Sequence, residues 1–471
     1  MSSTVHRPEH GGATALLLVD TGAIPYRAAV EDVEISNGAG EPGARYVYTE
    51  YVRTDLTEDE RARRPVVFAF NGGPGSASLW LHLGIGPRRI ADADTLSPRQ
   101  TPPFGLVDND DSPLDVADLV FIDPPGTGFS RLLGKEHAPA FYGTEQDARA
   151  TIEFIERWVR RNARENSPRF LVGESYGTLR AARVARNAGG GPFLGGATRA
   201  AHLSGAIVLG PAFALGDDSW AGEVRDALQL TSLAATARHH KIAREQATDD
   251  EVLEFAREEL LPVLTAGSMA SPQRRQAAAA RIAGLLGLDA QVVLGHDLRI
   301  SPNLYTRLAL ASSECVLGSY DSRYILPAAG AGDDPVSDDP AMGQYAPGFL
   351  GSIECYLRRD LAYVTTEDYR AIAWAEVYSD WDYGGPERRR SIDEFAEVLR
   401  RNPRFELLVG VGSYDLVTTS AAAAYAVSRH TVDGDRIHLR NYESGHMPYL
   451  GAAPRARLAQ DIRSFITRLS A

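Results

Sequence analysis

Leu171-Val172-Gly173-Glu174-Ser175-Tyr176-Gly177 joins an apolar stretch, residues 169–172, to a stretch of helix-forming residues, 178–186. A Gly-x-Ser-x-Gly motif between a strand and a helix is typical of a nucleophile elbow, a sharp turn that raises a serine hydroxyl above the sheet edge. Glycines fit this turn because side chains there would collide with neighbouring backbone. The motif alone is a weak signal, since a strand–loop–helix turn can contain a serine for no catalytic reason. The rest of the chain has to decide between these two interpretations.

Composition limits the classes of protein that this chain can represent. It has 471 residues with 44% apolar side chains, and its formal net charge of −13 is spread along the sequence. Nucleic acids and anionic membranes favour basic patches, so neither is the expected partner. The chain has two cysteines, Cys315 and Cys355, which excludes a disulfide framework and favours a reducing compartment. We read no signal peptide and no stretch of about 20 apolar residues, and expect a cytoplasmic protein.

Apolar runs alternate with helical patterns over most of the chain. Residues 13–53 alternate between apolar and polar side chains, as in a half-buried antiparallel strand. Continuous apolar runs, typical of strands covered on both faces, follow at 65–70, 118–123, 169–172, 206–210 and 407–410. Helices are predicted at 141–161 and 453–468. This alternation predicts a doubly wound α/β fold, with a mostly parallel central sheet and helices on both faces.

The middle of the chain has a different composition. From about residue 216 to 345, alanine, leucine and charged residues dominate and buried strand patterns are scarce. We therefore predict an inserted helical cap at 216–345 between two parts of an α/β core, 13–215 and 346–471. Residues 328–348, rich in glycine, proline and aspartate, are expected to form a surface loop of the cap.

Ser175 needs a base and a group that orients the base, and both candidates follow predicted strands. Asp415 follows the strand at 407–410, and His446 follows a short strand near 436–440. The order Ser, Asp, His is that of α/β-hydrolases, whose triads gather beyond the carboxyl ends of the strands. In this interpretation His446 takes the proton of Ser175, and Asp415 fixes the tautomer of the imidazole.

Each candidate has an alternative explanation. Asp415 could cap the helix that begins near residue 418, and a lone histidine is usually a surface or core residue. His82 and His438 are the closest rivals of His446, whereas the other histidines lie in the tail or the cap or lack its position after the last strand.

The serine mechanism also needs two backbone donors for an oxyanion. The amide of Tyr176 is the first candidate, and Gly73 in the glycine-rich turn after the strand 65–70 is the second. That turn, Asn71-Gly72-Gly73-Pro74-Gly75, could instead cradle a phosphate. The absence of a following Gly-Lys-Ser/Thr and of any nearby lysine argues against that alternative.

Taken together, these motifs resemble those of the serine carboxypeptidases. The matching segments, in the family's order from about residue 40 to the end, are Asn71–Ser76, Phe121–Ser130, Gly173–Gly177, Tyr414-Asp415 and Gly445-His446-Met447. The resemblance implies an α/β-hydrolase fold with a helical insertion and release of C-terminal residues from peptides through an acyl-enzyme. It also implies Ser175, Asp415 and His446 as the triad, and the amides of Gly73 and Tyr176 as oxyanion donors.

The resemblance further implies that Asn71, Gly72 and Glu174 hold the terminal carboxylate of the substrate. In the family this glutamate shares a proton with a second one, whose position is Gly84 here. Without the paired acid, an ionised Glu174 would repel a carboxylate. We therefore hypothesise that Arg88 or Arg89 supplies a counter-charge and that activity extends to neutral pH. The alternative is that both arginines lie on the surface.

A second departure from the family pattern lies in the glycine turn. Secreted members carry a disulfide-forming cysteine after its Pro-Gly, where this chain has Ser76. The difference agrees with the expectation of a reducing compartment.

Two other functions fit the same residues. Ester hydrolysis or acyl transfer could use the same triad on a peptide or small acyl substrate, and an α/β-hydrolase fold can serve for binding alone. No metal-ligand spacing such as His-Glu-x-x-His occurs, so neither a metal nor a cofactor is predicted. The side-chain preference and the oligomeric state do not follow from the sequence.

Overall fold

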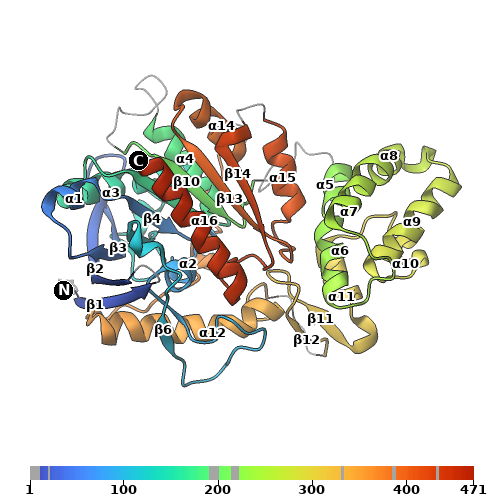
Figure 1. Ribbon diagram of the computed structural model, residues 1–471, viewed down its shortest axis with the longest axis horizontal. Coiled ribbons are helices and arrows are strands. Elements are labelled where there is room, and N and C mark those ends of the chain that lie inside the picture. Colours follow the sequence, from blue (N-terminus) through green and yellow to red (C-terminus); the bar gives the residue numbers. More distant parts are fainter. Residues whose placement is uncertain are drawn as a thin grey trace.

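The computed structural model describes residues 11–19, 22–189, 201–213, 222–329, 332, 334–384, 389–430 and 434–471. Its centre is a ten-stranded sheet in the order β1-β2-β3-β7-β4-β9-β10-β13-β14, with β8 paired to β3 (Figure 1). The strands of this sheet are β1 Gly11–Val19, β2 Gly22–Ser36, β3 Pro42–Arg53, β4 Val66–Phe70, β7 Asp118–Asp123, β8 Arg131–Leu132, β9 Arg169–Glu174, β10 Gly205–Leu209, β13 Glu406–Gly412 and β14 Ile437–Tyr442.

The sheet is antiparallel at its N-terminal edge and parallel in the rest. β1, β2, β3 and β7 pair antiparallel, as the alternating pattern of residues 13–53 predicts. From β7 through β4, β9, β10, β13 and β14 every pair is parallel. These are the continuous apolar runs, whose side chains are buried on both faces. The predicted α/β fold with a mostly parallel sheet is confirmed.

Helices cover both faces of the sheet, because neighbouring residues of a strand point to opposite sides. Val67 and Ala69 of β4 pack with helices α2, α12 and α16, whereas Val66 and Phe68 pack with α3, α4, α14 and α15. The bounds of these helices are α2 Leu79–Ile85, α3 Thr144–Arg161, α4 Gly177–Ala188, α12 Pro340–Cys355, α14 Ser391–Arg401, α15 Ser420–Ser428 and α16 Ala452–Ser470.

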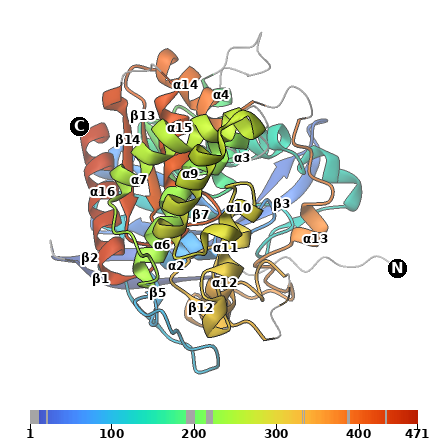
Figure 2. The same ribbon diagram turned by 90° about the vertical axis from the view of Figure 1, so that its right-hand side faces the viewer.

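The first helices after β10 form a separate body that projects from one side of the sheet domain (Figures 1 and 2). It has its own apolar core, which includes Leu233, Phe255 and Ile282. We call this body, residues 222–310, the helical cap. Its helices are α5 Gly222–Leu228, α6 Leu230–His239, α7 Asp249–Phe255, α8 Leu261–Ala266, α9 Pro272–Leu286, α10 Ala290–Gly295 and α11 Pro302–Leu308.

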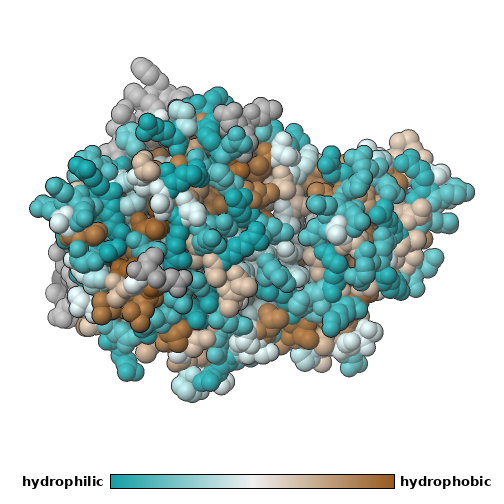
Figure 3. Space-filling model, in the orientation of Figure 1, coloured by the Kyte–Doolittle hydropathy of each residue, from teal (hydrophilic) through white to brown (hydrophobic). Residues whose placement is uncertain are grey.

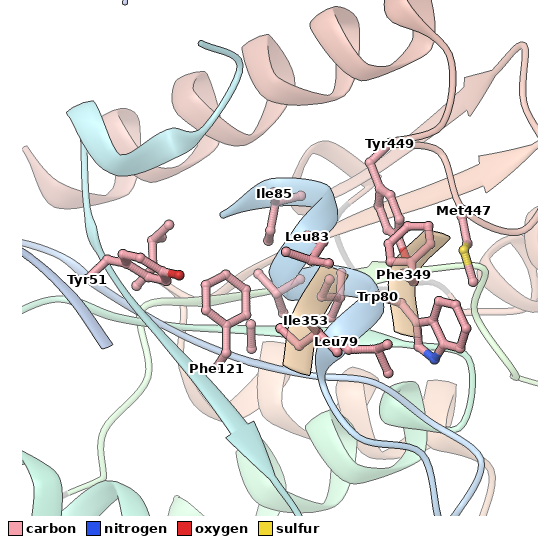
Figure 4. Packing of buried hydrophobic residues seen from close by; sticks show 14 of the residues in the cluster. Tyr51, Leu79, Trp80, Leu83, Ile85, Phe121, Phe349, Ile353, Met447 and Tyr449 are labelled. Atoms are coloured by element: carbon pink, nitrogen blue, oxygen red, sulfur yellow. The ribbon is translucent and has the colours of Figure 1, made fainter. Parts of the chain in front are cut away.

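The chain returns from the cap through a short hairpin, β11 Cys315–Leu317 and β12 Ile325–Pro327, and then α12. The expectation of a surface loop over 328–348 is wrong in its second half, because α12 starts at Pro340. Asp339 caps this helix through the amides of Ala341 and Met342. α12 packs on the main core beside α2, as the buried Phe349 and Ile353 show (Figure 4). The helix thus belongs physically to the sheet domain, although the predicted cap extends to residue 345.

The remaining elements are short. They are α1 Glu58–Arg63, the hairpin β5 Arg88–Ile90 with β6 Leu106–Asp108, and α13 Trp374–Val377. No helix in the described part of the chain is both long enough and apolar enough to cross a membrane. The visible surface is mostly hydrophilic, with apolar side chains gathered where it dips between the sheet domain and the cap (Figure 3).

A buried ion cluster joins three segments at the amino ends of the central strands. Asp118, at the start of β7, accepts a bond of 2.8 Å from Arg64 and one of 2.7 Å from Arg164. All three side chains are buried. The cluster therefore links the segments before β4 and β9 to the start of β7. It lies at the amino ends of these strands, whereas Glu174 is at the carboxyl end of β9.

We expect Asp118→Ala to lower the free energy of unfolding by about 3–5 kcal/mol, because two buried guanidinium groups lose their carboxylate. Asp55→Ala removes a partly exposed carboxylate bound to Arg53 and should cost at most about 1 kcal/mol. Urea denaturation of both variants measures the difference. Equal midpoints for the two variants would contradict a stabilising role of the cluster.

Candidate active site

The predicted nucleophile elbow is present between β9 and α4. Ser175 has φ = +57°, a strained conformation for a residue with a side chain. A Cβ on Gly173 would lie 2.3 Å from the carbonyl oxygen of Gly177, so the turn closes only with glycine at that position. Ser175 is partly exposed, whereas the residues on either side of it are buried. The strained turn thus presents the serine hydroxyl at the sheet edge.

Asp415 and His446 meet beside this elbow. The Nδ1–H of His446 donates to Oδ2 of Asp415 at 2.7 Å, and both side chains are almost fully buried. The other carboxylate oxygen of Asp415 accepts from the amides of Val417 and Thr418 at 2.8 and 2.9 Å. Asp415 therefore holds the turn after β13 with one oxygen and orients the imidazole with the other. The alternative that it caps the following helix is wrong, because α15 starts at Ser420 and its N-cap is Thr419.

The end of β10 brings Ser175 and His446 to the same place. The amide of Ser175 donates to the carbonyl of Leu209 at 3.0 Å. The next residue, Gly210, has φ = +49°, and a Cβ there would lie 2.7 Å from Cε1 of His446. Nε2 of His446 is buried and has no hydrogen-bond partner among the described residues. It is free to accept a proton from the serine, since catalytic hydrogen bonds are often long before substrate binds.

Opposing effects set the protonation of His446. Burial lowers the pKa of its imidazole, but the charge of Asp415 and the hydrogen bond to it outweigh burial, so the net pKa lies above the usual value. The rival histidines have other roles. His82 is buried against the Tyr51 hydroxyl, and burial lowers its pKa to about 3, whereas His438 contacts Glu406 at the far end of β14.

The amides of Gly73 and Tyr176, the predicted oxyanion donors, belong to the glycine turn and the elbow, which lie close together. Neither of these N–H groups donates a hydrogen bond to any described residue. A Cβ on Gly72 would lie 2.5 Å from the amide nitrogen of Tyr176, which shows how closely the glycine turn approaches the elbow. The predicted oxyanion donors are thus adjacent and unused by the described fold.

A buried arginine holds the glycine turn in place. Arg180 of α4 donates to the carbonyl of Asn71 and to the carboxylate of Asp147, each at 2.7 Å. All of these groups are buried. Sequence reasoning missed this residue, since an arginine in a helix after the elbow is usually a surface residue.

The elbow opens into a cavity of about 940 Å³ between the sheet domain and the cap. Gly73 and Ser175 line it together with side chains from α5, α13 and the loop after β13. The larger polar and aromatic side chains of this lining include Arg225, Gln229, Tyr320, Trp374, Tyr378 and Tyr383. A site of this volume suits a short peptide or a similar acyl compound.

Tyr320 is a site residue that sequence reasoning assigned only to the cap. Its carbonyl accepts from the amide of His446 at 2.7 Å, and its ring lies 5.3 Å from the imidazole. Asp321 accepts from the amide of Gly445 at 3.1 Å. The segment returning from the cap therefore fixes the histidine loop, a contact between positions 124 apart in the chain.

Glu174 and Asn71 form a buried polar pair next to Ser175. Nδ2 of Asn71 donates to Glu174 at 2.7 Å, while its amide oxygen accepts from Leu81. Burial is the main cause that raises the pKa of Glu174 to about 7, and nearby His446, Tyr449 and Asn71 oppose it. The pair is close to the serine, but neither side chain lines the cavity.

The structure also explains the missing second carboxyl group. A Cβ on Gly84 would lie 2.4 Å from the ring of Tyr449, so that ring fills the space that a side chain at position 84 would occupy. Figure 4 shows Tyr449 beside α2, the helix that carries Gly84. The neighbour of Glu174 on this side is thus a phenol, whose pKa burial raises well above its usual value. It remains uncharged at neutral pH.

Arg88 and Arg89 do not reach this site. Arg88 pairs with Asp108 at 2.6 Å across the β5–β6 hairpin, and Arg89 lies 3.6 Å from Asp94. Neither side chain lines the cavity. The hypothesis of an arginine clamp from these two residues therefore fails, because the hairpin directs both toward other carboxylates.

No cluster of three or more metal-ligating side chains occurs in the described ranges. Ser175, the imidazole–carboxylate pair and two free amides are the groups of an acyl-transfer site. Together with the sheet order and the elbow, they define the fold and site of an α/β-hydrolase.

Comparison with known proteins relates one part of the chain to a family. Residues 46–185, which include the glycine turn and the elbow, match the family model described as serine carboxypeptidase. The predicted resemblance is confirmed, and this match supports an enzyme of the serine carboxypeptidase type among the hydrolases. Comparison with curated protein sequences gave no match.

One of three similar solved structures supports the fold. Kex1(delta)p, a prohormone-processing carboxypeptidase from Saccharomyces cerevisiae, is similar with a TM-score of 0.57 and 15% identity, covering 95% of this chain and 91% of that chain. A proline iminopeptidase from Mycobacterium smegmatis has a TM-score of 0.35 at 13% identity, covering 93% and 99%. A carboxyl esterase from Bacillus coagulans has 0.36 at 12%, covering 94% and 99%. The last two scores are too low to carry an argument.

We expect Gly210→Ala to lower kcat at least about 100-fold, because the added methyl group displaces the imidazole of His446. Gly295→Ala, at a helix end where nothing lies within 4 Å of the new Cβ, should leave kcat unchanged. Steady-state kinetics on a small neutral ester measures both variants, and thermal unfolding shows whether each one folds. A folded Gly210→Ala variant with normal kcat would contradict the placement of His446.

Proposed function

We propose that this enzyme releases C-terminal residues from peptides through an acyl-enzyme formed on Ser175. The observation that carries the proposal is the buried pair of His446 and Asp415 beside a strained serine, with Nε2 of the imidazole free. Ser175 and Gly73 both line the cavity. A peptide bond held there would lie between the nucleophile and the oxyanion donors.

Each group has a distinct role in the proposed reaction. His446 takes the proton from the hydroxyl of Ser175 as its oxygen attacks the scissile carbonyl. The amides of Gly73 and Tyr176 donate to the oxygen that becomes negative. The proton then passes from His446 to the leaving amine, and the C–N bond breaks to give the acyl-enzyme. Water, deprotonated by the same imidazole, releases the shortened peptide.

Asp415 stabilises the imidazolium that forms in each half of the reaction. Its carboxylate is fully buried, which makes its charge effective at short distance. The hydroxyl of Thr418 also donates to it, at 2.5 Å. Thr418 is therefore a positioning residue of the triad, which keeps the carboxylate directed at Nδ1 of His446.

We assign the terminal carboxylate of the substrate to Asn71, Gly72 and Glu174, as the family resemblance implies. A carboxylate can approach Glu174 only when that residue is neutral. Because the pKa of Glu174 is raised to about 7, it is protonated in acid and becomes charged as the pH rises above neutrality. Binding of the free acid should therefore weaken at alkaline pH.

Ser175→Ala should lower kcat for a blocked dipeptide at least about 10⁴-fold, because it removes the nucleophile. Release of the terminal amino acid, followed by chromatography, measures this loss. A fluorophosphonate should label the wild-type protein at Ser175 and leave the variant unlabelled, as mass spectrometry of the modified peptide shows. Cleavage of esters without any cleavage of free-acid peptides would overturn the peptidase assignment in favour of an esterase.

The dependence of kcat/KM on pH should be bell-shaped for free-acid peptides. Activity rises with pH as His446 loses its proton, through its raised pKa, and falls as Glu174 ionises near pH 7. Glu174→Gln, which cannot ionise, should abolish the alkaline decline and keep the acid limb. A neutral ester assayed with the wild type should likewise show the acid limb alone. If the alkaline decline persists in Glu174→Gln, another group is responsible for it.

A further inference from the structure

The cavity has an uneven distribution of charge. Arg225, on α5 of the cap, is the one charged side chain among the described residues that line it. Its guanidinium group makes no ion pair or hydrogen bond to any described residue. A cation that faces a cavity without a partner calls for an anion in the bound ligand.

The carboxylates closest in sequence are already neutralised. Glu223 and Asp226, on the same helix as Arg225, both bind Arg299, the former at 2.9 Å. These contacts hold the two acidic groups on Arg299, so that neither pairs with Arg225. Among the described residues, the guanidinium group of Arg225 is therefore available to a ligand.

The surroundings of Arg225 favour a specific contact. Gln229 lies one helical turn further and lines the same cavity, held by a bond of 3.1 Å from its amide to the carbonyl of Ile300. Trp374, Tyr378 and Tyr383 line the cavity from the sheet domain. Arg225 itself is exposed, and these aromatic residues give the opposite side of the cavity an apolar wall.

We propose that Arg225 binds a carboxylate group of the substrate and so makes the enzyme selective for peptides that present one in the cavity. The planar guanidinium fork matches a carboxylate with two parallel hydrogen bonds. This inference rests on the proposed function and deepens it, since it adds a specificity residue from the cap. The carboxylate is either an acidic side chain of the substrate or its chain terminus, which would then bind Arg225 in place of Asn71, Gly72 and Glu174. The experiment below separates these two sources.

The test measures binding of blocked dipeptides to the full-length protein in the Ser175→Ala background, so that no ligand is consumed. Four ligands are compared: one with a free C-terminus, the same one as its amide, and both of these with a glutamate in place of glutamine. Isothermal titration calorimetry gives Kd for each ligand, with and without Arg225→Gln. Arg257→Gln, which removes an exposed arginine of the cap outside the cavity, is the matched control.

Arg225→Gln should raise Kd about 10- to 100-fold for ligands that carry the recognised carboxylate and leave neutral ligands unchanged. A loss that follows the free terminus identifies the terminal carboxylate, and a loss that follows glutamate identifies the side chain. Arg225→Lys should recover part of the affinity, because it keeps the charge without the fork. Arg257→Gln should change none of the four values.

Equal affinities with and without Arg225→Gln would overturn the inference, as would an equal loss for charged and neutral ligands. The proposed function fails in a different way. Absence of peptide cleavage by the wild-type protein would refute the carboxypeptidase mechanism whatever these affinities are. If the wild-type protein cleaves peptides but Arg225→Gln does not change the preference for ligands with a carboxylate, this inference alone is refuted.

Discussion

The active site depends on the parallel register of four neighbouring strands. Glu174 of β9 pairs with Leu209 of β10, and Leu209 pairs with Gly410 of β13. Gly412 in turn pairs with Tyr442 of β14. Because parallel strands end at the same edge of a sheet, the loops that follow them are forced together. Ser175, Asp415 and His446 meet for that reason, although hundreds of positions separate the first from the last.

Close packing at this edge leaves little room for other side chains. A side chain at position 173 would collide with the backbone of the elbow, and one at position 210 would collide with the imidazole of His446. A side chain at position 84 would collide with the ring of Tyr449. Burial has an electrostatic consequence as well, since it raises the pKa of Glu174 while Asp415 keeps the pKa of His446 above its usual value. The same packing that positions His446 and Asp415 therefore also shifts the pKa values of Glu174 and His446.

Local patterns were sufficient for most of the fold and for the triad. The apolar runs located the central strands to within about one or two residues, which is the usual uncertainty of strand ends. Chain order and position after strands identified Asp415 and His446. Two failures show the limit of such reasoning. Residues 340–348 read as a loop because they contain proline and glycine, yet Asp339 caps a helix there whose apolar face packs on the main core. Arg88 and Arg89 lie near the glycine turn in sequence, but a hairpin turns them toward Asp108 and Asp94.

The sequence alone was enough to predict the elbow, the central strands and the three residues of the proposed triad. Strand patterns and turn chemistry are local properties, and the order of the triad residues can be read along the chain. Contacts across the fold settled what surrounds them. Tyr449 fills the place of a paired acid, Tyr320 fixes the histidine loop, and Arg225 faces the cavity without a partner in the described structure. These roles depend on which surfaces come into contact when the cap and the helices pack. The spacing of residues in the sequence does not predict those contacts.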